Sequence, residues 1–344
     1  MNKAVKIEDI AKALNLSRNT VSKALNGQPL PERTRRMIIA KAVEMNYKSM
    51  SLNLNLVNQR KRIALVSNQP FTNVDFFAPI TEAIESSCMA MGWQLTRYIM
   101  SGSGGTVKSD FLQFLHKLGI DGIICVETLA KETVKTIIES NIPAVFLDCP
   151  YFIPAVAGDY DVVFNDASAP INTIVRRLAR ETGVSAFTFV GDFEHCRGFY
   201  ERYSAMCQTL FQMGISHRSE NDILERDGSV LYEPNYLASR LKGLPDFPEC
   251  IIAANDFLAT NVLEALKKIR IAVPGTCQIV GFDNSRLSLT SSPKITTIGC
   301  NQFFLGKEAI DTLIQRIKDP AKPTTFVYIQ SKIIFRNTTL LRAR

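Results

Sequence analysis

Polar residues near the amino terminus have the types and the spacing that recognition of nucleic-acid bases requires. Four of them recur at helical spacing: Arg18, Asn19, Ser22 and Lys23. On an α-helix, residues three and four positions apart share one face. Arg and Lys donate hydrogen bonds to guanine edges, Asn pairs with adenine, and small hydroxyls contact phosphates. The pattern therefore predicts a helix that reads the major groove of double-stranded DNA.

A second group of polar residues closes apolar runs in the rest of the chain. Its members are Asn68, Asp148, Asp166, Asp192, Asp256 and Asp283. Open α/β sheets bind ligands at the carboxyl ends of their strands, where carboxylates can accept hydrogen bonds from hydroxyl groups. Each Asp could instead cap the helix that follows it. As a group, these residues predict a cleft that suits a polyhydroxylated ligand such as a sugar.

The helix that carries the first group is predicted to belong to a helix-turn-helix. Apolar residues recur at helical spacing over residues 7–14, and Ser17 stands where the N-cap of a second helix belongs. That helix is predicted from Arg18 to Leu25, and Asn26-Gly27 would close it. A third helix over residues 30–47 completes the predicted headpiece. The alternative is a helical hairpin with an incidental polar face, because short patterns of this kind give false matches.

Positive charge is concentrated in the same region. Residues 1–62 contain 13 Lys and Arg against 4 Asp and Glu, whereas the whole chain contains 40 and 33. The remaining residues are therefore close to neutral. This segregation is typical of a nucleic-acid-binding module joined to a neutral body. The alternative, a basic face that is only solvated, does not predict that the positive charge is concentrated in one region.

The composition indicates a globular protein of more than one domain. With 344 residues the chain exceeds one typical domain, and it has no apolar run long enough to cross a membrane. Its start, MNKAVKIED, lacks the apolar core of a secretory signal, so a cytoplasmic location is expected. The eight cysteines form no CxxC pair and the three histidines form no metal-binding pattern. We therefore expect reduced thiols, no metal and no cofactor.

From residue 62 onward, short apolar runs alternate with helical stretches. The runs include RIALVS, DGIICVE, IPAVFLD, SAFTFVGD and CIIAAND. Strands that alternate with helices predict parallel sheets covered on both faces. Because the units are too numerous for one compact sheet, two doubly wound subdomains are expected. The predicted organisation is an all-α headpiece at 1–48, a linker at 49–61 and an α/β body at 62–344.

Motifs in the headpiece and in the body resemble the LacI/GalR family of bacterial transcription regulators. L-S-R-N-T-V-S-K-A-L-N-G at 16–27 is similar to the family's recognition helix, with Lys23 where the family mostly has Arg. Later segments follow the family's order of motifs, with CIIAAND, AVPG, GFDN and PKITT. The resemblance covers essentially the whole chain. It implies a body of the periplasmic-binding-protein type, with a ligand between the two α/β subdomains.

The resemblance also assigns roles in DNA binding. The expected base readers are Arg18, Asn19 and Lys23, and the expected phosphate contacts are Ser17, Thr20 and Ser22. Asn26 and Leu56 complete the predicted DNA-binding set. In the family, a linker leucine enters the minor groove when the linker folds on operator DNA, and spacing places Leu56 there. The family pattern Y-x-P-N-x-x-A reads Y-K-S-M-S-L-N here, so Leu52 or Leu54 could share that role.

In the body, the resemblance implies an effector site. The predicted effector-binding set is Phe76, Phe77, Asp148, Asp166, Arg202, Asn255, Asp256 and Asp283. The aromatic rings would stack on the ligand, Arg202 would donate a two-pronged hydrogen bond, and the Asn and Asp side chains would accept. The alternatives are core packing for Phe76, a surface ion pair for Arg202 and helix capping for Asp256. Cys300 stands where the family has glutamine, so the ligand does not follow by analogy.

The sequence thus favours a homodimeric repressor that binds a palindromic operator and responds to a small molecule, with a carbohydrate as the expected effector. The first alternative is a solute-binding protein of the same fold, against which the basic helix-turn-helix and the missing signal segment argue. The second is an enzyme that uses the cleft. No P-loop, GxGxxG motif or nucleophile–base set supports the enzyme.

Overall fold

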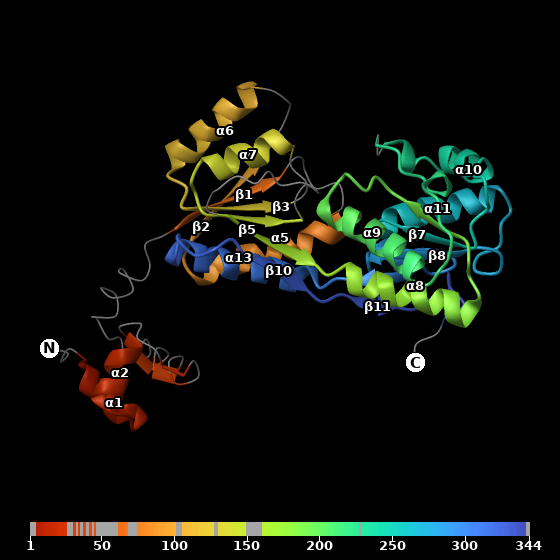
Figure 1. The fold of residues 1–344 in the computed structure, drawn as a ribbon. Coiled ribbons are helices and arrows are strands. Elements are labelled where there is room, and N and C mark those ends of the chain that lie inside the picture. Colours follow the sequence, from red (N-terminus) through yellow and green to blue (C-terminus); the bar gives the residue numbers. More distant parts are fainter. Residues whose placement is uncertain are drawn as a thin grey trace. The chain divides into compact units, whose positions relative to one another are not determined.

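The computed structural model describes residues 5–25, 30–31, 34, 37–38, 41–42, 45, 61–67, 74–100, 105–126, 130–148, 160–226 and 229–341. The chain divides into two compact units, residues 1–61 and 62–344 (Figure 1). The predicted boundary between headpiece and linker, near residue 48, lies outside the described residues. So do Asn26 and Leu56 of the predicted DNA-binding set and the strand-end residue Asn68.

The N-terminal unit contains the predicted helix pair. Helix α1 spans Ile7–Leu14 and helix α2 spans Arg18–Leu25, and described residues between 34 and 42 are also helical. Asp9 caps α1 by accepting a hydrogen bond from the Lys6 backbone N–H at 2.8 Å. Asn15 ends the helix in the left-handed conformation, with φ 52°, which Asn tolerates better than most residues. The core of this unit is formed by Ile10, Ala11, Val21, Ala24, Ile38 and Ala42.

The first sheet of the body is parallel throughout its described pairs. Its order is β10-β5-β4-β3-β1-β2, with β1 Arg62–Ser67, β2 Gln94–Ile99, β3 Gly122–Val126, β4 Ala144–Leu147, β5 Tyr160–Asn165 and β10 Phe326–Ile329. Helices α5 (Val74–Ala90) and α13 (Gln302–Lys318) cover one face. Helices α6 (Gly105–Leu118) and α7 (Lys131–Glu139) cover the other (Figure 1).

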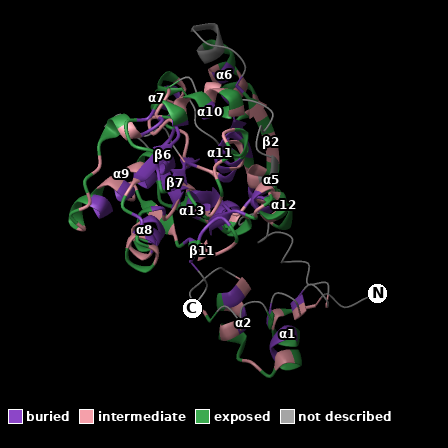
Figure 2. Cartoon of the chain, turned by 90° about the vertical axis from the view of Figure 1, so that its right-hand side faces the viewer, coloured by how far each residue is buried: buried purple, intermediate pink, exposed green. Residues whose placement is uncertain are grey.

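The second sheet has the order β11-β9-β8-β7-β6. Its strands are β6 Phe187–Val190, β7 Cys250–Ala253, β8 Gln278–Asp283, β9 Thr296–Gly299 and β11 Lys332–Ile334, of which β11 runs antiparallel to β9. Its helices are α8 Ser168–Thr182, α9 Arg197–Gln212, α10 Pro234–Lys242, α11 Asp256–Lys268 and the short α12 Arg286–Thr290. Short 3-10 turns occupy 219–221 and 230–232. The buried strands β6 and β7 lie inside this layer of helices (Figure 2).

The chain crosses between the two sheets at 165–168, 299–302 and 329–332. The prediction of two doubly wound subdomains is therefore confirmed, but neither subdomain is a continuous segment. Helix α13 and strand β10 return to the first sheet after strands β6 to β9 of the second sheet, and β11 then returns to the second. The sequence pattern indicated only the alternation of strands and helices. The antiparallel strand β11 was also not expected.

A buried ion pair fastens the returning segment. Arg316 of α13 places Nη2 2.7 Å and Nε 3.0 Å from the two carboxylate oxygens of Asp161 on β5, and Arg316 is 1% exposed. The Thr325 backbone N–H also donates to Asp161, at 2.7 Å. Burial alone would raise the pKa of Asp161, but the hydrogen bonds from Arg316, Thr325 and Lys322 lower it below its usual value. The pair is therefore charged and fully bonded.

Candidate functional site

Helix α2 presents the predicted base readers to solvent. Arg18, Asn19 and Lys23 are exposed, while Val21 and Ala24 on the opposite side are buried. The Arg18 Nε lies 2.7 Å from Glu8 Oε1 on α1, with the two side chains 72% and 48% exposed. An ion pair this exposed is weak, so the guanidinium can exchange its partner for a phosphate or a base. The arrangement suits a recognition helix.

Ser17 and Thr20 have a structural task at the start of α2. The Thr20 backbone N–H donates to Ser17 Oγ at 3.0 Å, and the two hydroxyl oxygens are 2.7 Å apart. This is the N-cap predicted for Ser17, and it satisfies a backbone donor that the helix leaves unpaired. The predicted phosphate contacts of both hydroxyls would have to coexist with this cap.

Arg202 on α9 is the centre of the polar cluster in the body. The residue is 4% exposed, and its Nη1 donates to the Ala254 carbonyl. The guanidinium lies over the Phe282 ring, with 3.6 Å between Cζ and the ring centroid. Its Nη2 is 3.9 Å from Asp283 Oδ1, longer than a hydrogen bond, and Nε has no hydrogen-bond partner among the described residues. A buried Arg with unused donors is an unsatisfied group that a ligand can complete.

Asp283 lies at the end of β8, where its carboxyl group belongs to this cluster and its backbone is strained. Its φ of 104° lies outside the left-handed helical region that Asp tolerates, and strain of this kind is concentrated at functional sites. Burial raises the pKa of Asp283 to about 8; the nearby Arg202 opposes the rise, and Asp256 and Asp148 add to it. At neutral pH the carboxyl is therefore largely protonated, so it can both donate and accept hydrogen bonds.

Asp148, at the end of β4, connects the first sheet to α9 of the second subdomain. Its Oδ1 accepts from the Gly198 backbone N–H at 3.0 Å, and its Oδ2 accepts from the Cys196 thiol at 3.2 Å. A carboxylate is favoured there because the first turn of a helix carries partial positive charge. A Cβ on Gly198 would lie 3.0 Å from Asp148 Oδ2, so this close approach depends on glycine. The two subdomains therefore meet at a predicted effector residue.

Asn255 and Asp256 direct their side chains to the protein itself. Asn255 Oδ1 accepts from the Leu258 backbone N–H at 2.9 Å and so caps α11. Asp256 is 0% exposed and accepts from Thr297 Oγ1 at 2.6 Å and from the Ser285 backbone N–H at 2.7 Å. Burial raises the pKa of Asp256 to about 6, although these hydrogen bonds oppose the rise. Asp256 thus stabilises the backbone at Ser285, two residues after Asp283.

The other predicted effector residues lie near the first sheet and at a crossing. Phe76 and Phe77 stand in the first turns of α5, half-buried, with ring centroids 5.0 Å apart and an edge-on geometry. Asp166 follows β5 and accepts from the Ala169 backbone N–H at 3.2 Å, so it caps the start of α8. Its own N–H donates to the Ile329 carbonyl at 2.8 Å.

The structure adds an aromatic pair that the sequence analysis missed. The rings of Tyr232 and Phe257 are 4.9 Å apart, and the residues are 39% and 44% exposed. Burial raises the pKa of Tyr232, and the electrostatic influence of Cys196 and Asp192 adds to it, which places the phenol beside the loop that precedes α9. The local signal for this pair is Phe257 directly after Asp256 in the sequence.

His217, the histidine with the largest change in pKa, has a structural partner. Burial lowers the pKa of His217, but hydrogen bonds to Asp222 and Cys207 raise it to about 10, and the His217 Nε2 lies 3.0 Å from Asp222 Oδ2. Among the described residues, no group of His, Cys, Asp and Glu side chains has the arrangement needed to hold a metal ion. None of the described helices is both long enough and apolar enough to span a bilayer.

Comparison with known proteins finds relatives along nearly the whole chain. A family model described as periplasmic binding protein-like domain matches residues 176–339. The HTH-type transcriptional repressor PurR of Vibrio vulnificus is 24% identical over 348 residues, which cover 96% of this chain and 98% of the relative. The HTH-type transcriptional regulator GalR of Lacticaseibacillus casei is 26% identical, with 97% and 99% covered. Both are named as regulators, in agreement with the expectation that the chain is not an enzyme.

Solved structures share the fold. The lac repressor dimer bound to operator and the anti-inducer ONPF gives a TM-score of 0.68 at 20% identity, covering 98% of this chain and 100% of that one. A complex of the transcriptional regulator CelR with cellobiose gives a TM-score of 0.68 at 18% identity, covering 97% and 99%. The predicted fold class, an all-α headpiece with two periplasmic-binding-protein-like subdomains, is confirmed.

Proposed function

Because the chain belongs to the LacI/GalR family of transcriptional regulators, we propose that it is a homodimeric repressor that binds a palindromic operator and responds to a small-molecule effector. The observation that carries the DNA-binding role is the exposed face of α2. There Arg18, Asn19 and Lys23 point to solvent, while the apolar side of the helix is fixed on α1.

Operator binding is tested by selecting DNA sequences with the full-length protein and measuring the affinity of variants. A dimer presents two recognition helices about one DNA turn apart, so selection should return an inverted repeat. Asn19→Ala should weaken binding by about 1–3 kcal/mol and relax the preference at one base position. The control is Lys135→Ala, at an exposed lysine on α7 of the body, which should bind as the unaltered protein does. An equal loss on all sequences would identify Asn19 as a phosphate contact and contradict base reading.

The effector is proposed to bind at the cluster of Arg202, Asp283 and Asp148. A polyhydroxylated ligand suits this cluster, because Arg202 offers unused donors and the acidic side chains offer acceptors for hydroxyl groups. The Tyr232–Phe257 pair would provide an apolar surface for a sugar ring. Asn255 and Asp256 would act through the loops they hold, and Phe76 and Phe77 would contribute from the first subdomain.

Effector binding is proposed to change DNA affinity through the contact between the subdomains. Asp148 holds α9 by accepting from Gly198 and Cys196, and a ligand that takes over these bonds would alter how the subdomains meet. A ligand shifts such an equilibrium only by its differential affinity for the two states, typically 1–3 kcal/mol. Whether the effector releases or promotes DNA binding follows from which state it prefers.

The effector class is tested by thermal unfolding of the full-length protein with sugars, sugar phosphates and nucleobases, because a ligand that binds only the folded state raises its stability. We expect a saturable increase in the unfolding temperature with a sugar, and its loss in Asp283→Ala. Stabilisation by nucleobases and not by sugars would contradict the assignment of a carbohydrate effector, but not the location of the effector site. An undiminished increase in Asp283→Ala would contradict the site.

A further inference from the structure

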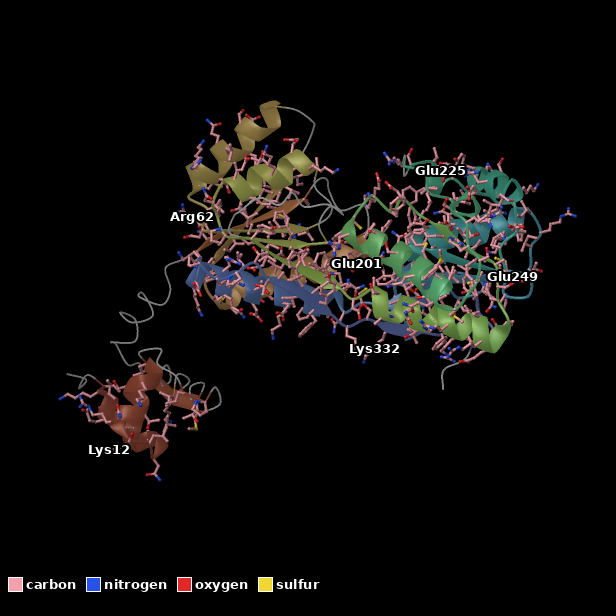
Figure 3. The ribbon with its side chains drawn as sticks, viewed as in Figure 1. Lys12, Arg62, Glu201, Glu225, Glu249 and Lys332 are labelled. Atoms are coloured by element: carbon pink, nitrogen blue, oxygen red, sulfur yellow. The ribbon has the colours of Figure 1, made fainter. Side chains whose placement is uncertain are left out.

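A pocket of about 560 Å³ lies beside the crossings between the subdomains. Its described lining residues are Asn284, Gly299, Cys300, Asn301, Phe304, Tyr328, Ile329, Gln330, Lys332 and Ile334. They come from the β9–α13 crossing, the β10–β11 crossing and the strand ends beside them. The volume is in the range of small-molecule sites in proteins. Lys332, one of the lining residues, is labelled in Figure 3.

The pocket adjoins the proposed effector cluster but does not include its charged residues. Its described lining includes neither Arg202 nor the acidic residues around it. A Cβ on Gly299 would meet Ile334 and Asn284, which are both lining residues, so this side of the β9 end faces the pocket. The next side chain, Cys300, is buried, and burial raises its pKa, with Asp283 adding to the rise and Arg202 opposing it. Cys300 lines the pocket and also lies near the charged residues of the cluster, so the two sites adjoin at this residue.

The pocket walls have a charge and a shape that define a ligand class. Lys332 supplies an ammonium group, and the described lining contains no carboxylate. Phe304 and Tyr328 expose 43% and 46% of their surface, so their rings are available for stacking. Asn301 uses its carbonyl oxygen to cap α13, accepting from the Phe304 N–H at 3.0 Å, which leaves its amide hydrogens for another acceptor.

The wall formed by Tyr328 is held in place by its neighbours. Its ring stacks on Phe164 with centroids 5.1 Å apart, and its hydroxyl donates to Glu201 Oε1 at 3.0 Å. Glu201 is in turn paired with Arg197 Nε at 2.8 Å. Because β10 belongs to the first sheet and α9 to the second subdomain, Tyr328 joins the two. A ligand against Tyr328 would therefore oppose reorientation of the subdomains.

We propose that this pocket is a second small-molecule site, specific for planar aromatic anions such as aryl carboxylates. The ring would lie against Phe304 and Tyr328, and the carboxylate would face Lys332 and the Asn301 amide. This assignment does not depend on the proposed DNA-binding function, because the binding itself is measurable.

The test is isothermal titration of the full-length protein with 2-naphthoate, and with 2-naphthalenemethanol as the uncharged analogue. We expect saturable binding of the carboxylate and at least about tenfold weaker binding of the alcohol. Lys332→Gln and Phe304→Ala should each weaken 2-naphthoate binding by at least about tenfold, which corresponds to 1.4 kcal/mol. Both positions are exposed, and circular dichroism checks that the variants fold.

The matched control is Lys318→Gln, at an exposed lysine at the end of α13 that is not part of the lining; it should bind 2-naphthoate as the unaltered protein does. Absence of saturable binding would overturn the proposal. So would equal affinity for the alcohol, or unchanged binding in both lining variants. Loss of binding in Arg202→Ala with retention in Lys332→Gln would place the probe in the effector cluster and would also overturn it.

Discussion

Among its described residues, the body contains two buried Arg–Asp pairs that differ in how completely they are bonded. Arg316 and Asp161 in the first subdomain meet at 2.7 and 3.0 Å, with further donors from Thr325 and Lys322. Arg202 and Asp283 in the second subdomain are 3.9 Å apart, with Arg202 Nε unpaired among the described residues. The first pair is saturated by the protein, whereas the second retains hydrogen-bonding capacity. A buried charge that the fold leaves incomplete is the better candidate for ligand binding.

The difference also appears in the protonation of the two acids. Hydrogen bonds lower the pKa of Asp161 in spite of its burial. Burial raises the pKa of Asp283 to about 8, because Arg202 is too distant to compensate. The same residue types, both removed from solvent, therefore give a fixed ion pair in one place and a titratable group in the other.

Arg316→Ala should produce the largest effect on stability. The change leaves the carboxylate of Asp161 buried without its main partner, and breaking a buried pair in this way costs about 3–5 kcal/mol. Urea unfolding of the full-length protein measures the loss. The control is Lys135→Ala, which removes an exposed ion pair with Glu139 and should cost less than about 1 kcal/mol. Equal losses in the two variants would show that Arg316 does not fasten α13 and β10 to the first sheet.

Arg202→Ala should cost less stability than Arg316→Ala but abolish the effector response. The expected loss is about 1–3 kcal/mol, from the bond to Ala254 and the packing on Phe282. Operator affinity without effector should stay within about threefold, while the change in affinity caused by the sugar found in the thermal screen, expected at 1–3 kcal/mol, should vanish. Asp283→Ala should behave in the same way. An effector response that persists in both variants would move the effector site away from this cluster.

The sequence was sufficient to predict most of this architecture, because strands such as β3, β4 and β7 are buried along their whole length and read as continuous apolar runs. It did not indicate β2 or β10, which lie at the sheet edges and consist of half-buried and exposed residues only. The return of α13 was also missed. The ion pair that fastens α13 joins Arg316 and Asp161, which are 155 residues apart, so no local pattern indicates it.

The sequence motifs were sufficient to identify candidate site residues, but not to assign a structural role to each of them. Arg202 and Asp283 were selected from local patterns, and the structure brings them together. The same patterns could not distinguish Asp283 from Asp256, because the difference is made by Thr297 and Ser285, which come from other segments and bond to Asp256. Tyr232 and Phe257 were missed because their pairing joins the turn before α10 to the start of α11.

Titration should separate the two pairs by the sign of their pH dependence. Asp283 holds its proton more tightly in the folded protein than its usual pKa allows, so its contribution to stability is complete at acid pH and falls as the pH rises through about 8. Asp161 has the opposite sign: its contribution is present above the usual carboxyl pKa and is lost as the pH falls.

The corresponding experiment compares unfolding temperatures of Asp283→Asn and the unaltered protein from pH 5 to pH 9. Because the amide cannot ionise, the unfolding temperature of the variant should rise by a few degrees relative to that of the unaltered protein as the pH rises. Asp161→Asn, measured from neutral pH down to pH 3, should be destabilised most at neutral pH and least in acid. A constant difference between Asp283→Asn and the unaltered protein across this range would mean that Asp283 is ionised throughout, like Asp161.

The exposed pair of Arg18 and Glu8 extends the comparison to the headpiece, where the smallest effect is expected. Their 2.7 Å contact is as short as the Arg316–Asp161 contact, but with the side chains 72% and 48% exposed, water and salt screen it, and such pairs contribute about 0–1 kcal/mol. Glu8→Gln should therefore leave operator affinity within about threefold, as fluorescence anisotropy with labelled operator would measure. A tenfold loss would mean that Glu8 positions Arg18 for its base. In that case an exposed ion pair would position a DNA-binding residue. The exposure of an ion pair would then not be sufficient to tell whether it serves the fold or the function.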